Sequence, residues 1–380
     1  MRFERSFFVA ALVVGFALAL ANVADAAFVT AAPPPVTAGL MVQLNGNNLS
    51  GAQASGVNRW VDQATAGPGG SDHQDFIGGS ADGDDNNDPR LENAHLMPNG
   101  LEANILNFNR GNIGSVNNSS TVNSQYMRSV VGGSDTGTTN GVDAAYNLSQ
   151  MTWFTVSRSY ISSFSTASNR RNQQFQTVIK GSYAAAADTW ETATSYSGYD
   201  SAGSSPGQNS AADLYLGLRD GAGAGSGRGV IDSVGGTGTD GGWYITAASW
   251  NTTTGDARMV IYDQNGIVMD ESYVQTTPFG SGLTGHSLTW LGAASTSTTA
   301  GQALHGDMAE VLIYDTALGT LQTNSVINYL NDKYFGSNTV LPVPEPNGFM
   351  IGGCSLVGFS VISAIVSLYH RRQKLRVTAH

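Results

Sequence analysis

The sequence predicts an all-β fold, a β-sandwich closed by one late helix, and three observations support this prediction. Glycine is abundant, with 47 residues, and only 12% of the residues are charged. Short segments of alternating apolar and polar residues are separated by stretches rich in Gly, Ser, Thr and Asn, which favour turns over long helices. Between residues 38 and 335, only one segment, close to the end, is expected to form a helix.

Alternation of apolar and polar side chains predicts the strands. The clearest hairpin joins residues 257–262 to residues 267–274 through Asp263-Gln264-Asn265-Gly266, where Asn-Gly supplies the positive φ angles of a tight turn. Further strands are expected at residues 39–44, 151–157, 175–179, 214–218, 288–292 and 309–314. Low-complexity loops are expected at residues 111–141, 195–212, 219–242 and 293–303.

The predicted helix runs from Thr320 to Tyr334. Leu321, Ile327, Leu330 and Tyr334 recur at spacings compatible with one helical face, which should dock on the sandwich. The tryptophans on the expected strands should mostly belong to the core. These are Trp60, Trp153, Trp243, Trp250 and Trp290.

The N-terminus is typical of a secretory signal peptide, here residues 1–26. Arg2 and Arg5 precede an apolar stretch, and Ala24-Asp25-Ala26 supplies the small residues that a signal peptidase needs. Cleavage is expected after Ala26 or Ala27, and the alternative is an uncleaved membrane anchor. A Pro-rich linker, residues 27–37, should follow.

The C-terminus combines three features in order. Pro344-Glu345-Pro346 in the linker 336–348 precedes an uncharged apolar run at 349–369, long enough to cross the roughly 30 Å hydrocarbon core of a bilayer as a helix. The tail, residues 370–380, carries Arg371 and Arg372 and should stay cytoplasmic, because basic residues beside a short apolar segment resist translocation.

This tail resembles the PEP-CTERM sorting signal of exported bacterial proteins. The resemblance implies that an exosortase reads the signal and cuts near the motif, so that the protein is a membrane-anchored precursor at the cell envelope, released or re-anchored after processing. Taken alone, the Pro-Glu-Pro tripeptide of residues 344–346 is more often a stiff linker.

Residues 38–335 form the expected domain, and three passages of it resemble the laminin G-like branch of the concanavalin A-like jelly rolls. They are Trp60-Val61-Asp62 within residues 57–63, the strand and hairpin of 243–274, and the closing strand and helix that begin at residue 306. The resemblance implies a jelly-roll β-sandwich with a helix after its last strand.

The net charge argues against nucleic acid as a partner, and the cysteine content argues against disulfide bonds. The formal net charge is −11, so phosphate backbones are repelled and we expect no nucleic-acid binding. The single cysteine, Cys354, lies inside the C-terminal apolar run, so the domain has no disulfide.

Catalytic carboxylates are not evident. Glucanases on the related fold space their carboxylates as Glu-x-Asp-x-Glu along one strand face, a spacing absent from this sequence. The nearest strand carboxylate is Glu310, bracketed by Asp307 and Asp315, and the resemblance implies that this Glu is structural. We therefore expect no catalytic residues and no enzyme, although a glycoside hydrolase-like activity is a weaker alternative.

One acidic segment has oxygen ligands in an order that suits calcium. Asp82, Asp84, Asn86 and Asp88 follow an Asp-x-Asp-x-Asn-x-Asp pattern, and hard cations prefer carboxylate and carbonyl oxygens. The Gly and Glu required in an EF-hand are missing, so the alternative is a flexible acidic loop.

The candidate carbohydrate-binding residues are Trp190, Tyr196 and Tyr199, because aromatic rings beside carboxylates offer stacking and hydrogen-bond acceptors to a sugar. A core-capping aromatic is an equally good interpretation of Trp190. Two functions remain: a non-catalytic adhesion or carbohydrate-binding module with extracellular polysaccharide as its partner, and a purely structural surface protein.

Overall fold

The computed structural model describes part of the chain, and for strands β8 to β11, β16 and β17 and for most of β15 it describes the backbone alone. The chain divides into two units, Met1–Val340 and Leu341–His380, and the description below concerns the first. The described residues are 27–29, 32–64, 76–78, 88–108, 125, 127–129, 150–159, 171–179, 188–195, 213–219, 229–232, 241–251, 253–274, 286–294, 301–304, 306–336 and 341.

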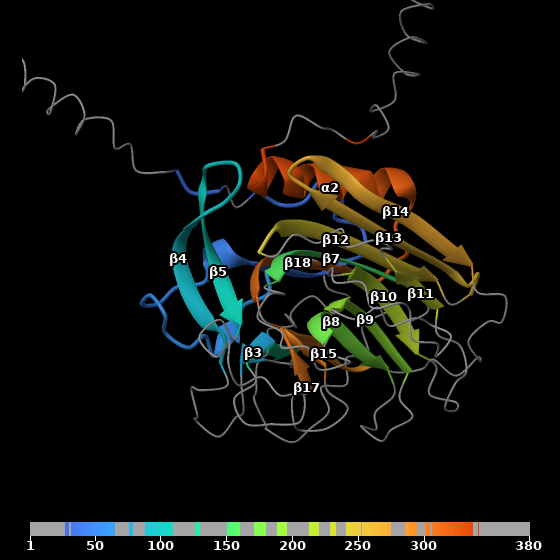
Figure 1. The fold of residues 1–380 in the computed structure, drawn as a ribbon, viewed down its shortest axis with the longest axis horizontal. Helices are drawn as coiled ribbons and strands as arrows, with labels where there is room; N and C mark the ends of the chain where they lie inside the picture. Colours follow the sequence, from blue (N-terminus) through green and yellow to red (C-terminus); the bar gives the residue numbers. More distant parts are fainter. Residues whose placement is uncertain are drawn as a thin grey trace, which may run out of the picture. The chain divides into compact units, whose positions relative to one another are not determined.

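Two eight-stranded sheets face each other (Figure 1), and every strand pair in them is antiparallel. The first sheet has β1 paired with β18 and otherwise the order β14, β13, β12, β7, β18, β5, β4. Its strands are β14 (Gly266–Val274), β13 (Asp256–Asp263), β12 (Trp243–Asn251), β7 (Gln150–Ser159), β18 (Gly306–Tyr314), β5 (Glu102–Phe108), β4 (Arg90–Leu96) and β1 (Leu40–Asn45).

The second sheet has the order β11, β10, β9, β8, β15, β6, β3, β2. Its strands are β11 (Gly229–Asp232), β10 (Asp213–Arg219), β9 (Asp188–Ser195), β8 (Arg171–Ile179), β15 (His286–Leu291), β6 (Met127–Ser129), β3 (Phe76–Gly78) and β2 (Arg59–Trp60). A 3₁₀ turn, η1 (Gly46–Asn48), follows β1, and β16 (Ala293–Ala294) pairs with β17 (Gly301–Ala303). The predicted all-β sandwich is confirmed.

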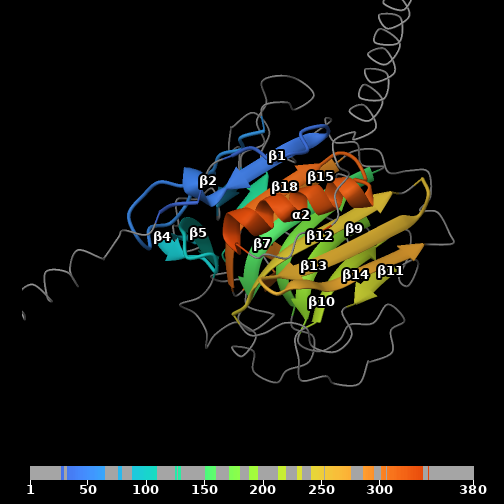
Figure 2. The same cartoon turned by 90° about the horizontal axis from the view of Figure 1, so that it is seen from above.

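Helix α2 (Thr320–Tyr334) covers the outer face of the first sheet, opposite the second sheet (Figures 1 and 2). Its bounds are those predicted from the sequence, and its position confirms the prediction of one late helix. Val326, Ile327 and Leu330 are fully buried, and each contributes roughly 1.5–3 kcal/mol of apolar burial. Leu321 was wrongly placed on this face, since it is 47% exposed. At about 100° per residue it lies half a turn from Leu330.

Strand β18 lies at the centre of the first sheet, and all nine of its residues are buried. It pairs with β7 along its length, and its other edge is shared by β5 and β1. Met308, Val311 and Ile313 belong to the core cluster that also contains Trp60, Trp153 and Trp250. These tryptophans are therefore core residues, as predicted.

A register shift between Met308 and Glu310 changes which side chains of β18 share a face. Met308 and Val311 both enter the core cluster although they are three residues apart. Because neighbouring side chains in a strand point to opposite faces, Asp307 and Glu310 both lie on the outer face.

The expected loops were partly wrong, because they contain short strands. β6 lies within residues 111–141, β11 within 219–242, and β16 and β17 within 293–303. Each has only two to four residues, too few to show an alternating pattern.

The predicted hairpin of β13 and β14 is present, and Asp263 pairs with Gly266. Gly266 has a φ of 125°, but Asn265 does not have the positive φ that we expected of it. Instead, the Asn265 amide donates to Oδ1 of Asp263 at 2.6 Å, so the aspartate side chain stabilises the turn.

Candidate functional site

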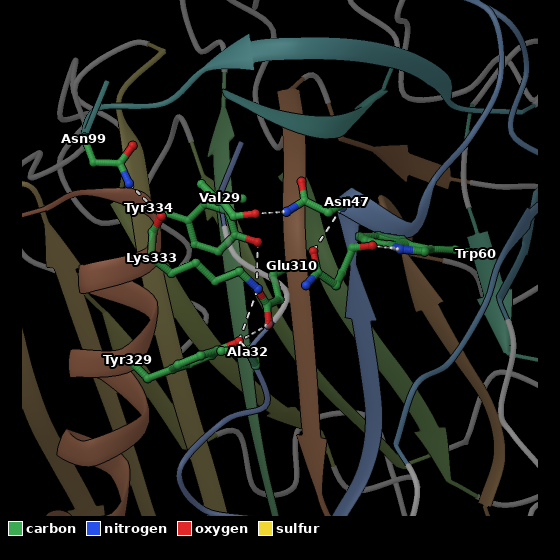
Figure 3. A network of polar contacts seen from close by, with 10 residues as sticks. Val29, Ala32, Asn47, Trp60, Asn99, Glu310, Tyr329, Lys333 and Tyr334 are labelled. Carbon is green, nitrogen blue, oxygen red and sulfur yellow. Dashed lines mark hydrogen bonds and ion pairs between the residues drawn. The ribbon is translucent and has the colours of Figure 1, made fainter. Parts of the chain in front are cut away.

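A buried polar network joins β18 to α2 around Glu310 (Figure 3). Lys333 Nζ donates to Oε2 of Glu310 at 2.7 Å, and the Tyr334 hydroxyl donates to the same oxygen at 2.6 Å. The Tyr329 hydroxyl lies 3.4 Å from Oε1. The Lys333 and Glu310 side chains are 2% and 0% exposed, so the ion pair is excluded from water.

Helix geometry explains how α2 supplies these groups. Tyr329 and Lys333 are four residues apart and therefore lie on the same side of the helix, with Tyr334 beside them. Lys333 Nζ is 5.4 Å from the centroid of the Tyr329 ring and 5.2 Å from that of Tyr334. The ammonium group is thus surrounded by one carboxylate and two aromatic rings, which partly offset its loss of hydration.

Burial raises the pKa of the phenol groups in this region, and the negative charge of Glu310 raises it further. The pKa of Tyr334 lies well above its usual value, and the pKa values of Tyr329 and Tyr314 are raised for the same two reasons. These tyrosines are therefore neutral hydrogen-bond donors at physiological pH.

The segment expected to be a Pro-rich linker instead lies along this network. We call its described residues, 27–29 and 32–37, the N-terminal strap. The Tyr329 hydroxyl donates to the carbonyl of Ala32 at 2.6 Å, and Asn47 Nδ2 donates to the carbonyl of Val29 at 2.7 Å (Figure 3). The strap is thus hydrogen-bonded to both the helix and the turn after β1.

A second polar cluster lies on the outer face, around Asp307. Asn107 Nδ2 donates to Oδ1 of Asp307 at 2.7 Å, and Arg158 Nε donates to Oδ2. The Arg158 guanidinium lies 4.9 Å from the centroid of the Trp243 ring, so it contacts both a carboxylate and an aromatic face. The Asp307 side chain is 0% exposed.

This cluster continues into the β4–β5 hairpin. The rings of His95 and Trp243 have centroids 5.8 Å apart, and Nδ1 of His95 lies 2.6 Å from Oε1 of Glu92. Trp243 is therefore in contact with Arg158 and with His95, and it is only 8% exposed. Its ring is enclosed by protein rather than presented to a ligand.

The clusters around Glu310 and Asp307 stabilise the fold through buried ion pairs. Asp307 and Glu310 lie on the same face of one strand, as an acid/base pair would, but each is buried and each has its own cationic partner. A glycosidase needs one carboxylic acid to donate a proton and one free carboxylate to attack or to activate water. Neither group has access to a substrate here.

The predicted glycan-binding and calcium residues are only partly described. Trp190 lies within β9, where its backbone pairs with Thr177 and Leu218, so it is part of the second sheet. Asp88 is buried, with its carboxylate against Gly56 and Gly78. The other predicted residues lie outside the described part of the chain: Tyr196, Tyr199, Asp82, Asp84, Asn86, Pro344, Glu345, Pro346, Arg371 and Arg372.

The described residues contain neither a cluster of metal ligands nor a helix that could span a membrane. No group of three or more His, Cys, Asp or Glu side chains there could hold a metal ion. No helix in the same residues is long and apolar enough to cross a membrane. Both predicted features, the calcium segment and the C-terminal helix, lie mainly or wholly outside these residues and stay predictions.

Sequence reasoning missed Lys333, Tyr329 and Asn47. The spacing of Lys333 could have revealed its burial. Lys333 follows Val326 by seven residues and Leu330 by three, so it lies on the buried face of α2. A lysine on a buried helical face requires a carboxylate opposite it, and Glu310 on the preceding strand was the nearest candidate.

No protein-family model matches the sequence, and no curated protein matches it. Solved structures to which the chain is similar include CBM40 of the Ruminococcus gnavus IT-sialidase bound to alpha2,3 sialyllactose, with 13% identity, a TM-score of 0.33, and coverage of 50% of this chain and 91% of that one. The binding domain of botulinum neurotoxin serotype D has 9% identity, a TM-score of 0.40, and coverage of 78% and 51%. The heptameric SAP-like pentraxin of Limulus polyphemus has 15% identity, a TM-score of 0.31, and coverage of 52% and 76%.

Proposed function

We propose that this chain is an exported, non-catalytic β-sandwich module that binds carbohydrate at the bacterial cell envelope. The proposal that the chain is not an enzyme rests on the two carboxylates of β18, which are buried and ion-paired. Asp307 and Glu310 share a face of β18, yet Arg158 and Lys333 neutralise them and both carboxylates are buried. Such groups stabilise the fold and have no free oxygen to offer a glycosidic bond.

Export and surface display are supported by the two ends of the sequence. The basic and apolar N-terminus with its Ala24-Asp25-Ala26 site is typical of a signal peptide. The Pro-Glu-Pro motif, apolar run and basic cluster of the C-terminus are the arrangement that an exosortase would read. Signal peptidase and exosortase are therefore the proposed processing partners, and the membrane is the proposed temporary anchor.

Carbohydrate binding is proposed for the region around Trp190, with Tyr196 and Tyr199 after the end of β9. Aromatic side chains stack on sugar rings, and Asp188, two residues before Trp190 and on the same face of β9, offers an acceptor for sugar hydroxyls. A neutral or cationic extracellular polysaccharide suits the chain, because its net charge of −11 disfavours strongly anionic polymers.

Replacing Trp190 with alanine tests this assignment. An exposed stacking ring should contribute on the order of 1 kcal/mol to glycan affinity, so the dissociation constant should rise several-fold while the melting temperature stays nearly unchanged. A glycan array of the full chain in detergent, with and without calcium, identifies the ligand, and titration compares the variant with the wild type. Trp290→Ala, on a neighbouring part of the same sheet, is the matched tryptophan control.

The result also separates binding from a spacer function. If Trp190→Ala lowered the melting temperature strongly and left glycan affinity unchanged, Trp190 would be a core residue and not a binding residue. Absence of binding to every glycan on the array would favour the purely structural surface protein. Loss of array signals on removal of calcium would support the segment Asp82, Asp84, Asn86 and Asp88 as the cation site.

Replacing Pro344, Glu345 and Pro346 together with alanine tests the sorting signal. The variant should accumulate as an uncleaved, membrane-retained precursor, whereas the wild type should lose its C-terminal tail. Mass spectrometry of the mature C-terminus in the native host measures this directly. Recovery of wild-type protein outside the cell with Arg372 and His380 still attached would contradict exosortase processing.

A further inference from the structure

The described N-terminal strap begins at Ala27, and this residue already belongs to the fold. The Ala27 carbonyl accepts a hydrogen bond from the Glu102 amide at 2.9 Å, and the Val29 amide donates to the Glu102 carbonyl at 2.9 Å. Phe28 forms a parallel bridge with Glu102 between these two bonds. An isolated parallel bridge therefore joins the strap to β5, and Ala27 supplies one of its two backbone hydrogen bonds.

The rest of the strap is held by side chains from three parts of the first sheet and its helix. Asn47 and Tyr329 donate to the carbonyls of Val29 and Ala32, and the Tyr314 hydroxyl donates to the carbonyl of Val36 at 3.0 Å. The Val29 side chain is only 4% exposed. A segment with this many hydrogen bonds and a buried anchor is part of the domain rather than a linker.

We propose that signal peptidase hydrolyses the bond between Ala26 and Ala27, so that the strap is the mature N-terminus of the protein. The reaction consumes one water molecule, leaves a carboxylate on Ala26 and frees the α-amino group of Ala27. This assignment rests on the proposed export, and it chooses between the two bonds that the sequence allows.

Two independent arguments favour this bond. Hydrolysis after Ala27 would remove the carbonyl that accepts from the Glu102 amide, leaving that amide without its strap partner. Hydrolysis after Ala27 would also place Asp25 at the third position before the cut, where the peptidase requires a small residue, whereas hydrolysis after Ala26 places Ala24 there.

The exposed position of Ala27 permits a matched pair of variants. Ala26→Phe should block cleavage, because a bulky residue then precedes the bond. Ala27→Phe should leave cleavage intact, because the residue after the bond is less restricted and its exposed side chain leaves the strap's backbone bonds in place.

The experiment expresses the full chain and both variants with the native leader in a bacterial host, then determines N-terminal sequence, intact mass and surface accessibility to protease. A wild-type N-terminus at Ala27, lost in Ala26→Phe and kept in Ala27→Phe, is expected. A surface-exposed protein that begins at Phe28, or a block by Ala27→Phe instead of Ala26→Phe, overturns the cleavage site and leaves export standing. A protease-inaccessible cytoplasmic protein that keeps Met1 overturns both.

Discussion

Replacing Glu310 with leucine is expected to lower the free energy of unfolding by about 3–5 kcal/mol, because Lys333 is then left buried without its counter-ion. Lys333→Met should cost a similar amount by leaving the Glu310 carboxylate without its cation. The double variant Glu310→Leu/Lys333→Met should be much more stable than the sum of the single effects predicts, since it leaves no unpaired charge. Urea unfolding of the four proteins measures the coupling free energy.

The exposed ion pair of the β13–β14 hairpin is the matched control. Arg258 donates two hydrogen bonds to Asp270, at 2.8 and 2.7 Å, but the Asp270 side chain is 37% exposed. Asp270→Leu should therefore change stability by at most about 1 kcal/mol. Additive effects of Glu310→Leu and Lys333→Met would show that the two groups do not interact in the folded protein.

Replacing Trp60 with alanine is expected to lower the free energy of unfolding by roughly 3–5 kcal/mol. The Trp60 side chain is fully buried in the core cluster, and its indole nitrogen donates to the carbonyl of Asn45 at 3.0 Å. The truncation removes this bond between β2 and β1 and leaves a cavity between the two sheets. Thermal and urea unfolding of the variant measure the effect.

Two further variants separate packing from the hydrogen bond. Trp60→Phe keeps most of the apolar volume, so its smaller loss reports chiefly on the indole donor. Val61→Ala, one residue further and 48% exposed, should stay within about 0.5 kcal/mol of the wild type. If Trp60→Ala had the same free energy of unfolding as Val61→Ala, the assignment of Trp60 to the core would be wrong.

The sequence predicted the elements whose pattern is strong and local. β7, β13, β14 and β18 carry enough apolar and β-branched residues to be recognised, and α2 was predicted with its observed bounds. β4 was missed because its residues are mostly polar and only partly buried. β5 is mostly buried, but Asn104 and Asn107 interrupt its apolar residues. β4 also contains a register shift between Glu92 and His95, which interrupts its alternation.

The site was less predictable because its contacts join distant residues. The structural role implied for Glu310 agrees with its buried network, but its partners Lys333 and Tyr334 come from a helix whose orientation no local pattern specifies. The strap was interpreted as a linker from its three consecutive prolines at 33–35. Prolines lack amide donors, yet the carbonyls around them accept hydrogen bonds from Tyr329 and Tyr314.

The central position of β18 determines when the chain can fold. Strand β18 pairs directly with β1, about 270 residues earlier, and also with β5 and β7. The first sheet therefore stays incomplete until residues 306–314 have been synthesised, and contacts of such sequence separation form slowly. A chain that completes its central strand last cannot form its first sheet from its N-terminal part alone, so its own topology delays folding until nearly the whole domain has been synthesised.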